Sequence, residues 1–168
     1  MIFTCEIDTP LGKMTAAAKD EALTGLWFNG QKYYPDKTDA WVGKAEHTVF
    51  AALRDWLADY FAGSNTPPAF PLAPRGTLFR QAVWGILLAI PYGETMTYGA
   101  IAASVAARRG LPSMSAQAVG GAVGHNPISI LIPCHRVVGT DGSLTGYAGG
   151  IERKEALLRL EAGTISLK

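Results

Sequence analysis

The first third of the chain alternates between apolar and polar side chains. From residue 3 to residue 8 the odd positions are apolar and the even positions are polar. This alternation predicts a half-buried strand and places Cys5 in the protein core. Two further runs, 14–18 and 23–28, are separated by turn residues and predict strands of the same antiparallel sheet.

A helical period then replaces the alternation. After Thr48, apolar side chains recur every three or four residues until Gly63, which predicts one amphipathic helix. Residues 64–75 contain four of the ten prolines and show no periodicity, as is typical of a linker. We therefore expect an N-terminal domain over residues 1–63 and a second domain over residues 76–168.

The second domain begins with three predicted helices. An apolar stripe over residues 77–90 predicts the first, and Thr97 is suited to cap the second. Ser113 or Ser115 can cap the third, residues 116–123, which contains two glycines and several alanines. Two helices joined by a turn, the second with a small-residue face, match a helix-turn-helix that enters a DNA groove. Tight helix packing explains the small residues equally well, so the pattern alone leaves both readings open.

The most reactive stretch of the chain follows these helices. Residues 128–132 are rich in β-branched side chains and predict a short buried strand that stops at Pro133. Cys134, His135 and Arg136 come next, and an imidazole can take the proton of a nucleophilic thiol. Neighbouring side chains on a strand point to opposite faces, so Cys134 and His135 can cooperate only through a turn or a bridging water. The alternative is a packing cysteine beside an exposed histidine.

Two more elements are predicted after this stretch. Residues 139–142 read as a tight hairpin turn, which would make residues 137–147 a small wing. Residues 151–162 form the last predicted helix, with Glu161 on its apolar face. An inward-facing carboxylate needs a partner, whereas an exposed glutamate near a helix end does not. The spacing alone does not decide between these two readings.

Composition and charge narrow the function classes. The chain of 168 residues holds only two cysteines, which makes a disulfide framework or a zinc cluster unexpected. No apolar run reaches transmembrane length and no secretory leader is present, so we expect a soluble protein that is not secreted. Residues 1–74 hold six Lys/Arg against nine Asp/Glu, a net charge of −3. Residues 75–168 hold nine against five, a net of +4, which favours a DNA-facing second domain.

The segment Pro133-Cys-His-Arg-Val137 resembles the signature of the methylated-DNA–protein-cysteine methyltransferases, also called O6-alkylguanine-DNA alkyltransferases. The resemblance covers about the last 90 residues in order, which makes it specific. The other matching segments are Gly76–Phe79, Ile90–Glu94, Thr97-Tyr98, Ala118–Ala122, Asn126-Pro127, Thr145–Gly150, Arg153–Glu155, Leu157-Leu158 and Glu161. It implies an α+β fold: a small N-terminal ribonuclease-H-like α/β scaffold domain and a C-terminal winged helix-turn-helix-like active domain.

The resemblance also implies a reaction and the residues that perform it. An alkyl group would move from the 6-oxygen of guanine, and from the 4-oxygen of thymine, to Cys134 after base flipping, once per molecule. His135, held by Glu161, would take the thiol proton through a water. Tyr98 would donate a hydrogen bond to the departing base, and Asn126 would act as a hinge whose side chain bonds the backbone around the cysteine. No cofactor or metal is expected.

Binding residues follow from the same resemblance. The backbone carbonyls of Val137 and Cys134 would read the base, and Ala148 would offer an N–H to its 6-oxygen. Tyr147 and Val123 would line the base pocket. The partner would be double-stranded DNA containing alkylated guanine, bound by a monomer in the bacterial cytosol or nucleoid, or in a nucleus, with no membrane contact. The expected DNA contacts are Ser115, Ala116, Gln117, Arg108, Arg109 and Arg136, the last with a structural role as its alternative.

Gln117 departs from the family pattern. Members usually carry an arginine at this position of the recognition helix, and that arginine fills the space left by the flipped nucleotide. Glutamine is shorter and uncharged, so we expect Gln117 to fill this space less well than an arginine. Arg108 and Arg109, in a long connection before the helix, are placed to supply the missing charge from the side.

Two rival functions come from different classes. A non-catalytic lesion-binding protein of the same fold would replace the reactive cysteine, usually with tryptophan, but Cys134 is present. A cysteine hydrolase would use the same relay, but it would need an oxyanion hole and would leave the helix-turn-helix unexplained.

Overall fold

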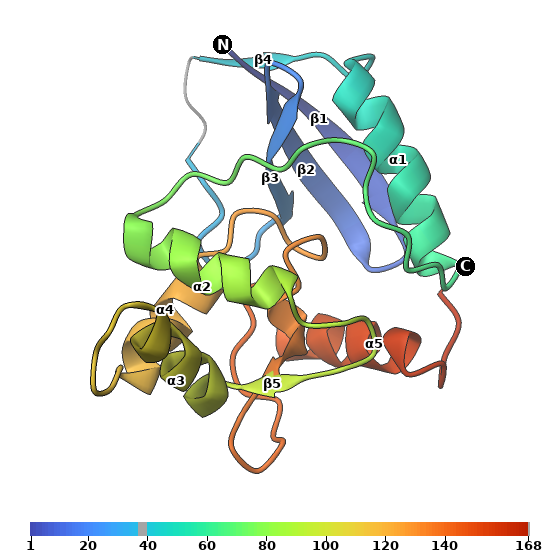
Figure 1. Ribbon diagram of the computed structural model, residues 1–168. Coiled ribbons are helices and arrows are strands. Elements are labelled where there is room, and N and C mark those ends of the chain that lie inside the picture. The colour runs from blue at the N-terminus through green and yellow to red at the C-terminus, as the bar shows by residue number, and fades with distance from the viewer. Residues whose placement is uncertain (37–39, 168) are drawn as a thin grey trace.

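The computed structural model describes residues 1–36 and 40–167. Its N-terminal part is a four-stranded sheet in the order β3-β2-β1-β4, drawn in blue to cyan in Figure 1. The first three strands run antiparallel, as the alternation predicts, and β4 joins β1 in parallel. The sequence pattern missed β4 because three residues are too few to show a period. The strands are β1 (Ile2–Thr9), β2 (Gly12–Lys19), β3 (Ala22–Phe28) and β4 (Trp41–Gly43).

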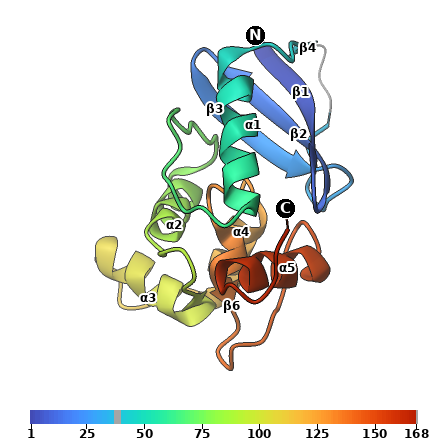
Figure 2. The ribbon, with the colours of Figure 1, turned by 90° about the vertical axis from the view of Figure 1, so that its right-hand side faces the viewer.

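One helix covers a face of this sheet. Helix α1 (Thr48–Phe61) lies along the sheet in Figure 2 and buries the stripe of side chains that predicted it. Its N-cap is His47, whose ring nitrogen accepts from the backbone N–H of Val49. Cys5 is buried in the core between sheet and helix, as expected.

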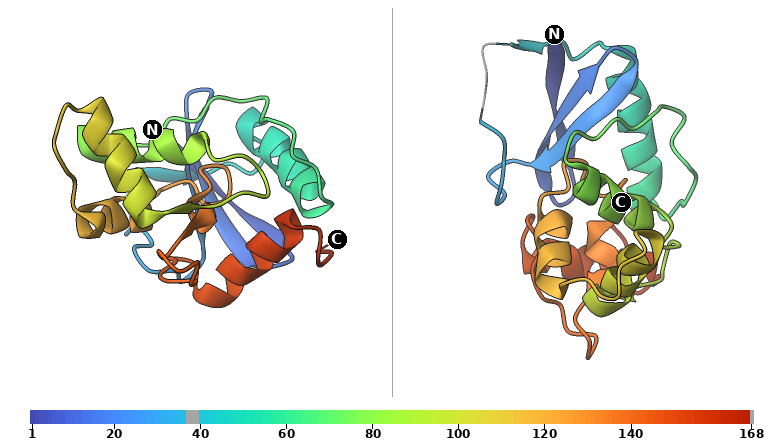
Figure 3. Two further views of the ribbon diagram at one scale, coloured as in Figure 1. Left: turned by 60° about the horizontal axis from the view of Figure 1, so that its bottom comes forward. Right: turned by 60° about the vertical axis from the view of Figure 1, so that its left-hand side comes forward.

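The second part of the chain is mainly helical. Helices α2, α3 and α4 cluster below the sheet, and α5 lies beside them (Figure 3). Thr77, Thr97 and Ser115 cap the first three, each accepting from the N–H three residues on. None of the described helices is both long and apolar enough to span a bilayer. The bounds are α2 (Leu78–Leu88), α3 (Tyr98–Arg108), α4 (Ala116–Gly124) and α5 (Ile151–Glu161).

The strand predicted over 128–132 is wrong. Residues 126–138, which we call the active segment, make one bridge to the sheet, between Ile128 and Leu26, and then turn. Ile130 has a φ of 73°, a left-handed conformation that a β-branched residue rarely adopts. The buried side chain of Asn126 bonds backbone groups of this segment and takes the place of a ladder partner.

The predicted hairpin wing is also wrong. Strand β6 (Val137–Val138) pairs in parallel with β5 (Met96–Thr97) instead of with the chain that follows it. The turn at 139–142 forms, but the residues after it are not a strand. The carbonyl of Thr145 accepts instead from side chains, one of which is the amine of Lys154. A backbone acceptor held in this way has less need of a ladder partner.

The outer edge of β3 joins the two parts of the molecule. Pro71 and Ala73 of the linker hydrogen-bond to the backbone of Leu23, so the linker follows the sheet edge. Further along, the N–H of Leu26 donates to a carbonyl of the active segment, and its own carbonyl accepts from Ser129. The sheet therefore fixes the reactive stretch directly, and the β3 edge is covered rather than free.

Candidate active site

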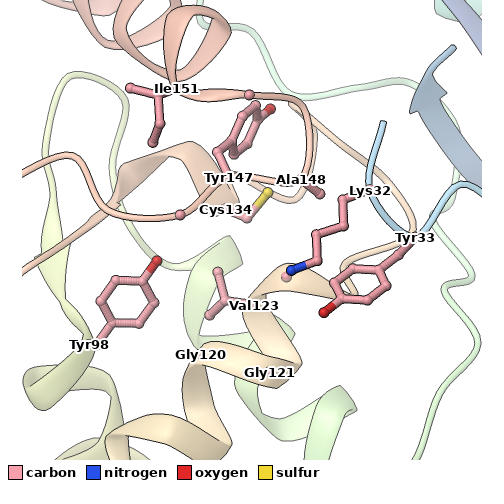
Figure 4. Close-up of a pocket in the computed structure, with 13 residues that line it drawn as sticks. Lys32, Tyr33, Tyr98, Gly120, Gly121, Val123, Cys134, Tyr147, Ala148 and Ile151 are labelled. Atoms are coloured by element: carbon pink, nitrogen blue, oxygen red, sulfur yellow. The ribbon is translucent and has the colours of Figure 1, made fainter. Parts of the chain in front are cut away.

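A cavity of about 380 Å³ opens beside Cys134 (Figure 4). Tyr98 lies on one side of it, and side chains from the N-terminal sheet region lie on the opposite side. Of the residues expected to contact the base, only Val137 is not in its wall. The lining residues that matter below are Lys32, Tyr33, Tyr98, Val123, Tyr147 and Ala148.

Cys134 begins a short 3-10 turn, Cys134–Arg136, rather than ending a strand. The residue is only 5% exposed, and burial raises the pKa of its thiol. The Asn126 side chain and the positive charge of Lys154 act in the opposite direction. Because burial is the largest influence, the resting thiol is protonated and needs a base before it can attack.

His135 is fully buried and contacts Glu161. Its Nε2 lies 2.6 Å from Oε2 of the carboxylate, and its Nδ1 has no hydrogen-bond partner among the described residues. Burial lowers the pKa of His135, with Glu161 opposing that shift. An ionised carboxylate can only accept a hydrogen bond, so Nε2 carries the proton and donates it to Glu161, and Nδ1 of the neutral ring is unprotonated. The structure thus joins His135 and Glu161, and it leaves Nδ1 available as a base.

The Glu161 carboxylate is the most heavily hydrogen-bonded side chain of the site. It accepts from the Tyr60 hydroxyl at 2.6 Å, from the Arg136 guanidinium at 2.7 and 3.0 Å, and from the Gly93 N–H at 3.2 Å. Burial alone would raise the pKa of Glu161, but the hydrogen bonds from His135, Arg136 and Tyr60 hold it well below its usual range. Glu161 is therefore an inward-facing carboxylate with partners and not an exposed glutamate near the helix end.

Arg136 is paired with groups inside the protein. Its side chain is 11% exposed, and it donates to Glu161 and to the carbonyl of Ile90 at 2.7 Å. The guanidinium also lies 5.7 Å from the ring centre of Tyr92. To reach a phosphate the guanidinium would have to break these bonds, which favours the structural alternative over the expected DNA contact.

Asn126 holds the backbone that leads to Cys134. Its amide accepts from the N–H of Ile128 at 3.0 Å and donates to the carbonyl of Ile132 at 2.7 Å. The side chain is almost fully buried, so these bonds are shielded from water. This is the arrangement that the resemblance implies for the asparagine.

Of the residues expected to read the base, Tyr98 and Ala148 line the cavity and Val137 does not. Tyr98 faces the cavity, and its hydroxyl donates to the carbonyl of Thr145 at 3.0 Å. Ala148 lies in the cavity wall, and its carbonyl accepts from the Lys32 N–H. Val137 is fully buried in the strand pair behind Cys134, so only its backbone could face a ligand.

Helix α4 presents an open face to solvent. Ser115, Ala116 and Gln117 are exposed at its N-terminal end. A Cβ added at Gly121 would have no atom within 4 Å, so tight packing inside the protein does not explain this glycine. Gly121 instead lines the cavity beside Cys134, and entry of this face into a DNA groove stays an expectation.

Arg108 and Arg109 end α3 next to this face. Both are exposed, although the Arg109 guanidinium lies 5.8 Å from the ring centre of Phe79. Neither forms an ion pair among the residues that the structure describes. Their charge is therefore available to an anionic partner.

Lys154 matches the family pattern in the sequence but was assigned no role from it. It is fully buried, and its amine donates to the carbonyls of Thr145 and Gly146 at 3.2 and 3.1 Å. Burial lowers its pKa to about 8, against the opposing effect of Cys134. A signal existed, because Lys154 lies three residues before Leu157 and so shares the apolar face of α5.

Lys32 and Tyr33 were missed for a different reason. They belong to the connection after β3 and enter the cavity wall only through the tertiary fold. Tyr33 has a φ of 63° and stacks on His125 at 3.8 Å between ring centres. No local pattern marks either residue. The described residues contain no group of three or more His, Cys, Asp or Glu that could hold a metal ion.

Comparison with known proteins agrees with this geometry. Residues 4–74 match the family model of the 6-O-methylguanine DNA methyltransferase ribonuclease-like domain, and residues 78–163 match that of its DNA-binding domain. The methylated-DNA–protein-cysteine methyltransferase of Mycobacterium tuberculosis (strain H37Rv) is 48% identical over 161 residues, covering 96% of this chain and 93% of the relative. The protein of the same name from Methanosarcina acetivorans is 44% identical over 154 residues, covering 92% and 94%.

Solved structures agree as well. The crystal structure of Mycobacterium tuberculosis OGT in complex with DNA has a TM-score of 0.87 and 45% identity, covering 98% of this chain and 95% of that one. The crystal structure of the M. tuberculosis O6-methylguanine methyltransferase has a TM-score of 0.82 at 45% identity, covering 100% and 97%. The fold is thus the two-domain α+β fold of a ribonuclease-like and a DNA-binding domain. The chain belongs to the methylated-DNA–protein-cysteine methyltransferase family.

Proposed function

We propose that this protein repairs O6-methylguanine in DNA by moving the methyl group to Cys134. The family defines the reaction as transfer from methylated DNA to a cysteine of the protein itself. The observation that carries the assignment is the location of the cavity. It is lined by Cys134, whereas Cys5 is buried in the N-terminal core and lines no part of it.

The His135–Glu161 pair would activate the thiol. We infer that the Cys134 proton passes through a water to Nδ1 of His135, while Glu161 holds the ring in the required tautomer. The thiolate then attacks the methyl carbon, a carbon–sulfur bond forms, and the carbon–oxygen bond to guanine breaks. The electron pair returns to the base, where a hydrogen bond from the Tyr98 hydroxyl stabilises it. A thioether is not reversed by thiol chemistry, so each molecule acts once.

The damaged nucleotide must leave the helix to reach this thiol. Cys134 is 5% exposed, and a base stacked in a duplex cannot approach it, so base flipping is part of the proposal. The cavity of about 380 Å³ is of a size that accepts a small ligand. The backbone carbonyls of Val137 and Cys134 and the N–H of Ala148 would read the flipped base, with Tyr147 and Val123 as walls.

The exposed face of α4 would bind the DNA. Gln117 at its start would fill the vacated stack, and Arg108 and Arg109 would contact phosphates. We propose double-stranded DNA containing alkylated guanine as the partner, a monomer as the active form, and a compartment that holds DNA as the location. Alkyl groups on the 4-oxygen of thymine belong to the same proposed substrate class.

We assign a separate role to each of the two domains and to the linker between them. Residues 1–63 would support the site, residues 64–75 would connect the domains, and residues 76–168 would bind DNA and accept the alkyl group. The hydrogen bonds between β3 and the active segment support this division of labour, because they fix the reactive stretch, while Lys32 and Tyr33 add part of the cavity wall.

Intact mass after mixing with O6-methylguanine DNA tests the proposal. A gain of one methyl group per molecule, with no further gain on excess substrate, is the expected result. An unchanged mass with DNA still bound would indicate a lesion-binding protein. Repeated substrate turnover without a change in mass would indicate a cysteine hydrolase.

A further inference from the structure

We infer that Tyr60, a residue of the N-terminal domain, is a positioning residue for methyl transfer. Its hydroxyl holds the Glu161 carboxylate and shares the oxygen that faces His135. The inference rests on the proposed function, because it assumes that His135 is the base for Cys134. It assigns the ribonuclease-like domain a direct part in the acid–base chemistry, beyond that of a scaffold.

The contact is short and internal. The Tyr60 hydroxyl donates to Oε2 of Glu161 at 2.6 Å, and the same oxygen lies 2.6 Å from Nε2 of His135. Tyr60 is 2% exposed and Glu161 is 7% exposed, so water does not compete for either group. Hydrogen bonds to a charged acceptor in a dry site are among the strongest in proteins.

Aromatic neighbours fix the position of the hydroxyl. The ring of Tyr60, in the last turn of α1, stacks on Trp56 at 5.2 Å between ring centres and 16° between planes. Phe61 and Tyr92 meet it edge-on at 5.4 and 6.2 Å. The ring is therefore packed from several sides and its hydroxyl cannot swing away from Glu161.

Tyr60 acts as a permanent donor. Burial, followed by the negative charge of Glu161, raises the pKa of Tyr60 far above its usual range. The hydroxyl thus keeps its proton at every pH at which the protein works. It can modulate the carboxylate, but it cannot act as the base itself.

The Tyr60 hydroxyl should lower the pKa of His135, because it takes up part of the negative charge on Glu161. Each donor on Oε2, the Tyr60 hydroxyl and the Arg136 guanidinium at 3.0 Å, reduces the negative charge that this oxygen offers to His135. Removing the Tyr60 hydroxyl would leave Glu161 to stabilise the imidazolium form more strongly, which raises the pKa of His135. Nδ1 would then become free to accept the Cys134 proton only at a higher pH. A purely structural role predicts lower stability but no such shift.

Tyr60→Phe and Tyr92→Phe make a matched pair. Both variants keep an aromatic ring in the same cluster, but of these two tyrosines only Tyr60 donates its hydroxyl to another described residue. The rate of single-turnover methyl transfer to each variant is measured against pH. For Tyr60→Phe we expect the acid-side midpoint to move up by on the order of half a pH unit, and the rate below that midpoint to fall about threefold. Tyr92→Phe should follow the wild type.

A second measurement needs neither DNA nor a variant. In the NMR spectrum of the wild-type protein, the Tyr60 hydroxyl proton should change its chemical shift in step with the titration of His135. A pH–rate profile of Tyr60→Phe that matches the wild type, or a hydroxyl proton that ignores the His135 titration, would overturn the inference. If the wild type takes up no methyl group, the proposed function fails, while the NMR titration still tests the link between Tyr60 and His135.

Discussion

The two cysteines of this chain have similar burial but different surroundings. Cys5 and Cys134 are 9% and 5% exposed, and burial raises the pKa of both thiols. Around Cys5 the opposing influence comes from Arg54 alone. Around Cys134 it comes from Asn126 and Lys154, and a cavity opens beside the sulfur. Burial alone therefore does not distinguish a packing cysteine from a reactive one.

What distinguishes them is the supply of a base and of space for a substrate. Cys134 is followed by His135, whose Nδ1 has no partner in the described structure and whose Nε2 faces Glu161. Cys5 lies on a regular strand whose neighbours alternate between core and solvent. A buried thiol with a base beside it stays protonated at rest and becomes a nucleophile only when the proton has a path. Removing the features of the Cys134 site one at a time should make it behave like Cys5.

Removing the acceptor itself should have the largest effect. Cys134→Ser should abolish methyl uptake while duplex binding is nearly unchanged, because phosphate contacts carry most of the affinity. Cys5→Ser is the matched control and should accept methyl at the wild-type rate. Uptake by the Cys134→Ser variant, measured by intact mass, would show that another residue is the acceptor.

The next largest effect should come from the carboxylate. Glu161→Gln should slow transfer at neutral pH by roughly 10²–10⁴-fold, the usual contribution of a general base and its support. Raising the pH should recover part of the rate, because the thiol then ionises without His135. Glu155→Gln, at a half-buried position on the same helix whose carboxylate pairs with Arg159, provides the comparison. A Glu161→Gln variant with the wild-type single-turnover rate would remove Glu161 from the mechanism.

Loss of the buried amine should have a smaller effect. Lys154→Met removes a positive charge that favours the Cys134 thiolate and should slow transfer about tenfold. The pKa of Lys154 is about 8, so the wild type loses the same charge as the pH rises through that value. The difference between variant and wild type should thus be largest below pH 8 and shrink above it. A rate ratio that is constant across this range would assign Lys154 to structure alone.

The smallest effect should come from the DNA-facing helix. Gln117→Arg adds a longer, charged plug and should speed transfer a few-fold on duplex DNA, with less gain on single strands, where no stack must be opened. Rates on the two substrates, measured side by side, check this. Equal gains on both would show that Gln117 does not fill the stack.

Arg108 and Arg109 should affect the salt dependence of DNA binding. Changing both Arg108 and Arg109 to alanine should weaken duplex binding and flatten its salt dependence by up to about two phosphate contacts. Binding is measured over a range of salt concentrations, with an exposed residue of the N-terminal domain, Lys13→Ala, as the control. A salt slope equal to that of the wild type would exclude these arginines as phosphate contacts.

Local patterns predicted most of the fold. The caps Thr77 and Thr97 and the periodic stripes behind them placed the helices within one or two residues. The strand expected over 128–132 failed because this backbone makes only one bridge, from Ile128 to Leu26 of β3, and the Asn126 amide bonds the backbone of Ile128 and Ile132. A side chain that replaces a ladder partner leaves no trace in hydrophobic periodicity.

The site was harder to predict than the fold. The resemblance pointed to Cys134, His135 and Glu161, and the structure brings the last two into contact. It could not reveal Tyr60, which is 101 residues away from Glu161 in the chain and lies in the other domain. Contacts of that range depend on how the sheet and the helices pack, which local sequence does not encode in any period.

Mapping the methyl group in the wild-type protein tests the central claim most directly. The protein is mixed with duplex DNA that carries labelled O6-methylguanine, digested, and analysed by peptide mass. We expect one label per molecule, all of it on the peptide that contains Cys134. Label on the Cys5 peptide, or label shared between the two, would contradict the account, because the neighbours of Cys134 would then not be what makes a buried thiol reactive.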